Sequence, residues 1–190
     1  MNNIQTNMVL DAKGLACPMP IVKTKKAIQE LEAGQVIEVQ ATDKGSKADL
    51  AAWAKSSGHH YLGTLEEGEV LKHYLRKATD EETVEKKHPH TVSNEGLAEL
   101  MNSGGDFTIL DVREEAEYAF GHIHGAISIP LGELEDRINE INKDKDVYVV
   151  CRTGSRSDLA AQKLQEQGFQ HVKNVLPGMS EWQFDIEKND

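Results

Sequence analysis

Short apolar stretches alternate with helix-like stretches over residues 8–77. The segments "MVLD", "QVIEVQATD", "HHYLGTLEEGE" and "VLKHYLRKA" have the composition of strands. One helix is predicted in "PMPIVKTKKAIQELEAG", where a single face carries Ile21, Thr24, Ile28 and Leu31. A second helix is predicted from Ser46 to Gly58. The order β-α-β-α-β-β predicts a two-layer domain over residues 1–77.

From residue 91 onwards the two kinds of stretch alternate more regularly. Helices are predicted at 93–104, 131–143 and 155–168. Strands are predicted at 107–112, 126–130, 146–150 and 171–175. This alternation predicts a three-layer α/β domain over residues 91–190, with a largely parallel sheet and helices on both faces. Ligands of such a sheet bind at the carboxyl ends of its strands.

The segment between the two predicted domains, residues 78–90, reads "ATDEETVEKKHPH". It contains charges and a proline but only one large apolar side chain, so it cannot bury enough apolar surface to fold alone. We therefore expect a linker. A flexible chain of this length spans roughly 20 Å on average, which would allow the domains to meet.

The composition agrees with two globular domains. The 190 residues are 38% hydrophobic and 28% charged, and no apolar run approaches the ~20 residues of a membrane helix. The N-terminus, "MNNIQTNMVLD", does not resemble a secretion signal. Together with only two cysteines, these features predict a cytoplasmic protein with free thiols.

The net charge of −11 is unevenly distributed. Residues 1–78 carry ten Lys and Arg against nine Asp and Glu, whereas residues 91–190 carry nine against nineteen. An acidic second domain argues against a nucleic-acid backbone as the main partner. The same charge is compatible with simple solubility.

Cys151 follows the apolar strand "DVYVV" and shortly precedes a predicted helix. N–H groups and the positive end of the helix dipole meet at such a position and stabilise a thiolate or a bound anion. Gly154 permits the turn, and Arg156 in the first helical turn needs a negative group beside it: the thiolate, a bound oxyanion or Asp158. The alternative is a buried, unreactive cysteine at the end of a core strand.

Cys17 precedes Pro18 and Pro20, and proline is favoured in the first turn of a helix. We expect the dipole of this helix to stabilise the Cys17 thiolate as well. Because prolines have no N–H group, this site is expected to bind an oxyanion less well than the Cys151 loop. The alternative is a cysteine that merely fills the start of a helix.

The stretch "CRTGSRS" resembles the rhodanese family of sulfurtransferases, as do "ILDVREEAEYAFGHIHGAISIP" before it and "NVLPGMSEW" after it. The resemblance covers about 100 residues and implies that Cys151 accepts a sulfane sulfur as a persulfide. It also implies that the terminal sulfur is held by the backbone N–H groups of the loop residues, which are Arg152, Thr153, Gly154, Ser155 and Arg156. The guanidinium groups of Arg152 and Arg156 would attract an anionic donor.

Two further pairs of residues lie in the same region. Asp111 and Arg113 end a predicted strand, and the resemblance places them near the active-site loop, although a simple strand-end ion pair is the favoured interpretation. His122 and His124 lack the additional ligands of a metal site. No metal and no other cofactor is therefore expected. Trp182 is expected in the core.

The stretch "LDAKGLACPMPIVKTKKAI", followed by "GQVIEVQATD", is similar to the TusA/SirA family of small sulfur carriers over residues 8 to about 77. Cys17, Pro18 and Pro20 match the Cys-Pro-x-Pro motif of that family, and Asp11 and Gly14 match the positions before it. The resemblance implies that Cys17 carries a persulfide that is passed between proteins, without a cofactor.

Together these resemblances favour a two-domain TusA–rhodanese sulfurtransferase. Sulfane sulfur from thiosulfate, a persulfide or a polysulfide would form a persulfide on Cys151, with relay to or from Cys17. The expected partners are this small donor and a thiol acceptor or sulfur-relay protein, with neither nucleic acid nor membrane involved. Positive charge near Cys17 would help two anionic sulfurs to approach each other, and nearby lysines could supply it: Lys13, Lys23, Lys25 and Lys26. A solvated helix face is the simpler interpretation of these lysines.

Two other classes of protein stay open. One binds or senses persulfides with its cysteines and has no turnover. The other is a cysteine-dependent phosphatase or arsenate reductase. Phosphatase loops resemble Cys-x5-Arg, whereas the interval from Cys151 to Arg156 is Cys-x4-Arg, and Val150 stands where phosphatases commonly have His.

Overall fold

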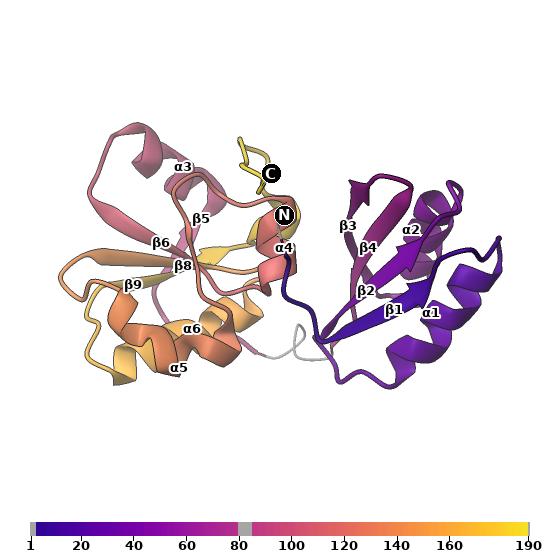
Figure 1. Ribbon diagram of the computed structural model, residues 1–190. Coiled ribbons are helices and arrows are strands. Elements are labelled where there is room, and N and C mark those ends of the chain that lie inside the picture. The colour runs from indigo at the N-terminus through magenta and orange to yellow at the C-terminus, as the bar shows by residue number, and fades with distance from the viewer. Residues whose placement is uncertain (1–2, 80–84, 190) are drawn as a thin grey trace. The chain divides into compact units, whose positions relative to one another are not determined.

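The structure, a computed structural model, describes residues 3–79 and 85–189. The chain divides after residue 80 into two compact units, drawn in Figure 1. Each unit has a hydrophobic core of its own, and each is described by itself below.

Unit 1 has the predicted order β-α-β-α-β-β. Its elements are β1 (Met8–Ala12), α1 (Met19–Gln29), β2 (Val36–Ala41), α2 (Ser46–Ser57), β3 (His60–Glu67) and β4 (Val70–Arg76). The sheet order is β1-β2-β4-β3, with β1 parallel to β2 and the other pairs antiparallel. The two helices pack on the sheet and close a core with β2 and β4, which confirms the predicted α/β layers.

The first helix forms because its apolar residues recur at helical spacing. Ala27 and Ile28 on α1 are buried, and Leu31 just beyond the helix is buried beside them. Thr24 occupies the same face, where its hydroxyl donates to the carbonyl of Pro20 at 2.7 Å. The second helix ends at Gly58, which adopts φ of +78°.

A buried histidine joins the two layers of unit 1. His73 on β4 is fully buried, and its Nε2 lies 2.8 Å from the hydroxyl of Ser46 at the start of α2. The Ser46 hydroxyl donates to the carbonyl of Asp43, so it accepts the His73 N–H. The Nδ1 atom of His73 lies 2.7 Å from the hydroxyl of Thr64 on β3. Burial lowers the pKa of His73 to about 4, so the imidazole is neutral near pH 7.

Unit 2 is built on a five-stranded, all-parallel sheet in the order β5-β9-β8-β6-β7. The strands are β5 (Thr91–Ser93), β6 (Phe107–Asp111), β7 (Ile127–Ser128), β8 (Asp146–Val150) and β9 (Val172–Leu176). The α-helices are α3 (Asn94–Asn102), α4 (Glu115–Phe120), α5 (Leu134–Arg137) and α6 (Ser155–Glu166). Short 3₁₀ turns are Leu131–Glu133, Ile138–Glu140 and Met179–Glu181.

Helices cover both faces of this sheet, as predicted. Figure 1 shows α3 on one face and α5 and α6 on the other. Side chains that alternate along the central strand enter two separate cores: Val147 and Val149 pack with α5 and α6, whereas Tyr148 and Val150 pack with α3. Burial on both faces is what a parallel sheet requires.

Several local details differ from the sequence-based prediction. The acidic stretch 113–125, for which no element was predicted, contains the helix α4. This helix begins with a capping box: the Glu114 side chain accepts the backbone N–H of Glu117, and the Glu117 side chain accepts the backbone N–H of Glu114. The helix predicted at 131–143 is broken into two 3₁₀ turns and one short α-helix, and the strand predicted at 126–130 is limited to Ile127–Ser128.

The predicted linker lies partly outside the described residues. Its described part after residue 84 packs against unit 2. The backbone N–H groups of Lys87 and His88 donate to the Asp158 carboxylate at 3.0 and 2.8 Å. The His88 side chain is buried, and its Nε2 lies 2.7 Å from the Val172 carbonyl. We name residues 85–90 the strap.

The burial of His73 predicts a pH-dependent stability of unit 1. Burial, and to a lesser extent the charge of Lys47, lowers the pKa of His73 from 6.5 to about 4. Neutral His73 therefore contributes its full stability above about pH 6.5, and this contribution is lost as the pH falls towards 4. A shift of this size corresponds to about 3 kcal/mol.

The measurement is urea unfolding between pH 7.5 and 4.5, followed by Trp53 fluorescence in a Trp182→Phe background. We expect His73→Gln to be less stable than its parent at pH 7.5 and to lose less stability on acidification. Equal loss of stability in the two proteins would contradict this role for His73.

Candidate functional site

Cys151 lies in the short loop between β8 and α6, at the carboxyl end of a central strand. Its side chain is 1% exposed, and its Sγ accepts the backbone N–H of Gly154 at 3.1 Å. Gly154 precedes the first residue of α6 and has φ of +93°. The loop thus turns an N–H group towards the sulfur at a helix start, where the dipole favours negative charge.

Glycine is required at two positions around this loop. A Cβ on Gly154 would lie 2.3 Å from Cδ2 of Leu176, and a Cβ on Gly178 would lie 2.6 Å from the Cys151 carbonyl oxygen. The segment after β9 packs against the loop, because the N–H of Met179 donates to that same oxygen at 2.8 Å. The Asn94 side chain donates to the Gly178 carbonyl and accepts its N–H.

Two buried polar side chains complete the surroundings of the sulfur. The hydroxyl of Ser157 lies 3.2 Å from Cys151 Sγ and donates to Oδ1 of Asn174 at 2.5 Å. The Nδ2 group of Asn174 donates to the Gly154 carbonyl at 3.0 Å, which fixes the orientation of the amide. Sequence reasoning did not identify Ser157 or Asn174, although "CRTGSRS" includes the serine.

The negative partner of Arg156 is Glu117, which was not among the three partners considered from the sequence. Arg156 donates to both carboxylate oxygens of Glu117 at 2.7 and 3.0 Å, and both residues are buried. Burial acts to lower the pKa of Arg156, but Glu117 and, more weakly, Cys151 outweigh it and raise that pKa. Asp158, one of the expected partners, accepts instead from the strap.

Asp111 and Arg113 form the ion pair that was favoured from the sequence. The Arg113 guanidinium donates to both Asp111 carboxylate oxygens, the shortest contact being 2.7 Å, and also to the Gly121 carbonyl. Burial opposes the charge of Arg113, but Asp111 and then Glu117 raise its pKa. Charges of alternating sign therefore extend from Asp111 through Arg113 and Glu117 to Arg156.

The structure places the other predicted residues of this loop as follows. Arg152 and Thr153 are half-buried, and the Arg152 carbonyl accepts the N–H of Ser180 at 2.9 Å. Ser155 is buried and is the first residue of α6. The five loop residues and Cys151 thus lie together, with Asp111 and Arg113 connected to them through Glu117.

Cys17 lies just before α1 and is exposed. Its thiol donates to Oδ2 of Asp49 at 3.1 Å, and its backbone N–H donates to Oδ2 of Asp43 at 3.1 Å. Pro18 is the residue before the helix, and Pro20 is buried in its first turn. The predicted position at a helix start is thus present, but carboxylates from another part of unit 1 surround the cysteine.

These carboxylates reverse the expected effect on the thiol. The hydrogen bond to Asp49, together with the negative charges of Asp49 and Asp43, raises the pKa of Cys17 above its ordinary value. The expectation of a thiolate stabilised by the helix dipole is therefore wrong for Cys17, because a nearby full negative charge opposes a second one more strongly than the partial dipole charge favours it.

The remaining residues near Cys17 have local roles. Asp11 accepts the N–H of Lys13 and forms an exposed ion pair with its ammonium group at 3.9 Å. Gly14 adopts φ of +76° and donates its N–H to the Thr42 hydroxyl at 2.9 Å. On α1, Lys23, Lys25 and Lys26 are exposed.

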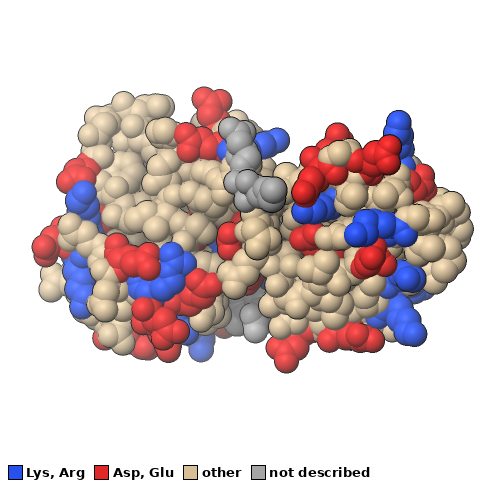
Figure 2. Space-filling view, viewed as in Figure 1, with Lys and Arg blue, Asp and Glu red and all other residues tan. Residues whose placement is uncertain are grey.

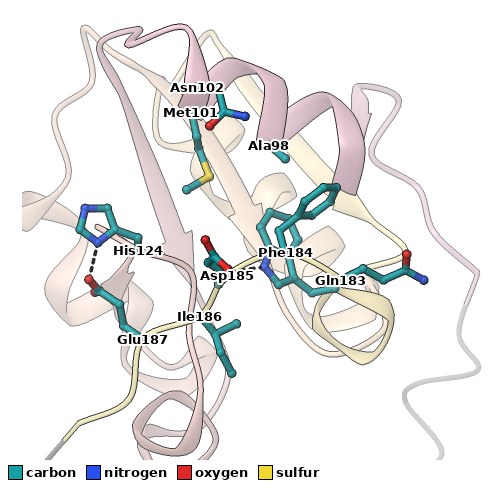
Figure 3. Close-up of a pocket in the computed structure, with 10 residues that line it drawn as sticks. Ala98, Met101, Asn102, His124, Gln183, Phe184, Asp185, Ile186 and Glu187 are labelled. Atoms are coloured by element: carbon teal, nitrogen blue, oxygen red, sulfur yellow. Dashed lines mark hydrogen bonds and ion pairs between the residues drawn. The ribbon is translucent and has the colours of Figure 1, made fainter.

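A cavity of about 580 Å³ lies between α3 and the segment 182–187 of unit 2 (Figure 3). His124 lines it and is paired with Glu187 in Figure 3, whereas His122 is buried and stacks on Tyr118. Trp182 is partly buried, packs on the α3 core and also lines the cavity. Among residues 3–79 and 85–189, no group of three or more His, Cys, Asp or Glu is arranged to hold a metal ion.

Charges are mixed over the face shown in Figure 2, where red and blue side chains are interspersed on both units. Within the part of the chain that the structure describes, no helix is both long and apolar enough to cross a bilayer.

The structure thus contains a small α/β unit with an exposed cysteine before a helix and a parallel α/β unit with a buried cysteine at a helix start. Residues 8–77 match the family model "Sulfurtransferase TusA", and residues 93–185 match "Rhodanese-like domain". The chain belongs to the family of proteins in which a TusA domain precedes a rhodanese-like domain.

Individual relatives agree with this assignment. The chain is 51% identical to "Putative sulfur carrier protein YrkF" of Bacillus subtilis over 94% of this chain and 97% of the relative. The chain is also 35% identical to a "Sulfurtransferase" of Allochromatium vinosum, over 48% of this chain and 85% of that protein. A rhodanese-like domain protein from Staphylococcus aureus has a TM-score of 0.50 and 29% identity, over 53% of this chain and 99% of its own.

The carboxylates around Cys17 lead to a prediction for its reactivity. In a Cys151→Ser background, Asp49→Asn should lower the pKa of Cys17 because the hydrogen bond to Asp49 is the largest contribution that raises it. Each unit of decrease raises the thiolate fraction about tenfold at neutral pH. The measurement is the pH dependence of alkylation by iodoacetamide.

Asp43→Asn is the matched control, because Asp43 contacts the backbone of Cys17 rather than its sulfur. We expect the pKa of Cys17 to decrease less in Asp43→Asn than in Asp49→Asn. If the midpoint of the alkylation–pH profile is unchanged in Asp49→Asn, Asp49 does not hold the thiol proton.

The pair of Arg156 and Glu117 leads to a prediction for stability. Glu117→Gln leaves a buried guanidinium without its counter-charge, which should destabilise unit 2 by about 3–5 kcal/mol. Urea unfolding followed by Trp182 fluorescence in a Trp53→Phe background measures this loss. Glu115→Gln on the same helix is the control and should cost below about 1 kcal/mol. Similar losses in both variants would refute the special role of Glu117.

Proposed function

We propose that the chain transfers sulfane sulfur through a persulfide on Cys151. The observation that carries this proposal is the setting of the Cys151 sulfur, which accepts a loop N–H at the start of α6 and interacts electrostatically with Arg156. The TusA and rhodanese-like domains and the sulfurtransferase names of relatives support the same reaction class.

In the first half-reaction, the Cys151 thiolate attacks the outer sulfur of thiosulfate. A new S–S bond forms to Cys151 as the S–S bond of thiosulfate breaks, and its electron pair leaves with sulfite. The loop N–H groups stabilise the negative charge on the transferred sulfur. A low-molecular-weight persulfide or a polysulfide would react in the same way, with a thiolate or a shorter polysulfide as the leaving group.

In the second half-reaction, a thiol takes the outer sulfur. Cys17 is exposed and therefore accessible to a persulfide. It loses its proton and attacks the outer sulfur of the Cys151 persulfide, and Cys151 leaves as a thiolate. The Asp49 carboxylate, 3.1 Å from the Cys17 sulfur, is positioned to take the proton. The reverse reaction would load Cys151 from Cys17, and a separate relay protein would react by the same chemistry.

The connection of the two domains in one chain favours relay between them. Two thiols in one chain can meet at an effective concentration of about the millimolar range, without a separate molecular encounter. Both cysteines are free thiols, which suits a reducing compartment such as the cytoplasm.

Thiosulfate and cyanide provide the direct test. We expect the unmodified chain to form thiocyanate and sulfite, and Cys151→Ser to lose at least about 100-fold of this activity because its hydroxyl is a poor nucleophile. Peptide mass spectrometry should find a sulfur adduct on Cys151. If Cys151→Ser keeps full activity, the proposal is wrong.

Cys17→Ser separates relay from the first half-reaction. This variant should retain thiocyanate formation, because cyanide attacks the Cys151 persulfide directly. Relay predicts a sulfur adduct on Cys17 that vanishes in Cys151→Ser, whereas a persistent adduct would mean that Cys17 is loaded independently. Persulfide formation without thiocyanate would instead favour a sensing or binding protein.

A further inference from the structure

The strap, residues 85–90, reaches the Cys151 loop. Its backbone is anchored by the hydrogen bonds from Lys87 and His88 to Asp158, a residue in the first turn of α6. The buried His88 side chain fixes the other side of the strap against β9. These contacts hold Lys86, which directly precedes Lys87, near the N-terminus of α6, the helix that follows the Cys151 loop.

The side chain of Lys86 extends over Gly154. A Cβ on Gly154 would lie only 2.9 Å from Cε of Lys86, and the ammonium group is one bond beyond that atom. The N–H of Gly154 donates to the sulfur of Cys151 at 3.1 Å. The exposed side chain of Lys86, which is not part of the loop, therefore lies beside Gly154, whose N–H contacts the Cys151 sulfur.

Arg156, one of the two loop arginines expected to attract an anionic donor, is already paired within the protein. Both of its terminal nitrogens donate to the buried Glu117 carboxylate, so its charge is balanced within the protein. Thiosulfate carries two negative charges, and its approach to a thiolate is repulsive. A positive group near the loop that is not buried against a carboxylate lowers this repulsion.

We propose that Lys86 is a specificity-determining residue of the Cys151 site, whose ammonium group binds the oxygens of an anionic sulfur donor such as the sulfonate end of thiosulfate. This inference rests on the proposed sulfurtransferase function. The inference places Lys86, which belongs to the segment between the two predicted domains, in the binding site of the sulfur donor. The Lys86 ammonium takes no part in bond making or breaking.

The test compares Lys86→Gln with Lys87→Gln in the full chain. Lys87 contributes its backbone N–H to the strap and is the matched control, because glutamine retains that N–H. With thiosulfate and cyanide at low ionic strength, Lys86→Gln should raise KM for thiosulfate about three- to fivefold, the size expected for one exposed charge contact, with kcat unchanged. Lys87→Gln should change neither constant.

A second donor separates charge recognition from a general disturbance of the loop. With 2-hydroxyethyl persulfide, whose carbon end is uncharged, both variants should match the unmodified chain in KM. Added salt should raise KM for thiosulfate more in the unmodified chain than in Lys86→Gln.

The inference is overturned if KM for thiosulfate is unchanged in Lys86→Gln, if it rises equally in Lys87→Gln, or if KM for 2-hydroxyethyl persulfide rises equally. A different result refutes the proposed function itself: the unmodified chain forms no thiocyanate from either donor and gains no sulfur on Cys151. In that case the proposed role of Lys86 in donor binding is refuted together with the proposed function.

Discussion

The buried ion pair between Arg156 and Glu117 is the contact on which the Cys151 loop depends. Both charges are removed from water, and each stabilises the other at hydrogen-bond distance. The pair fixes α6, which begins directly after the loop, against α4. It is continued by Arg113 and Asp111 at the end of β6, so the position of the loop is tied to a second strand of the sheet.

The two cysteines illustrate how similar backbone positions can give opposite electrostatic environments. Both lie at the start of a helix. Cys151 faces an N–H group and interacts electrostatically with a guanidinium group, whereas Cys17 faces the carboxylates of Asp49 and Asp43. A full charge a few ångströms away outweighs the partial charge of a helix terminus. In the proposed sulfur transfer, Cys151 would be the acceptor and Cys17 would react from its protonated form.

Much of the fold followed from periodicity alone. The order of elements in unit 1 and the long elements of unit 2, such as α3, β8 and α6, have apolar residues at regular spacing, and these predictions are confirmed. The prediction failed for short pieces, such as α4 within an acidic stretch and the broken helix near Leu134. There, capping hydrogen bonds and contacts with neighbouring elements decide the conformation, and a few residues carry too little periodicity to reveal it.

The sequence by itself determined the long elements, the two-domain organisation and the residues of each cysteine motif, because spacing and residue type are local properties of the chain. Only the tertiary structure decided which charges meet those residues. Glu117, Asp49 and Lys86 are 39, 32 and 68 residues away from Arg156, Cys17 and Gly154, respectively. Their effects depend on distances of a few ångströms between side chains that are far apart in sequence, and no local pattern specifies such distances.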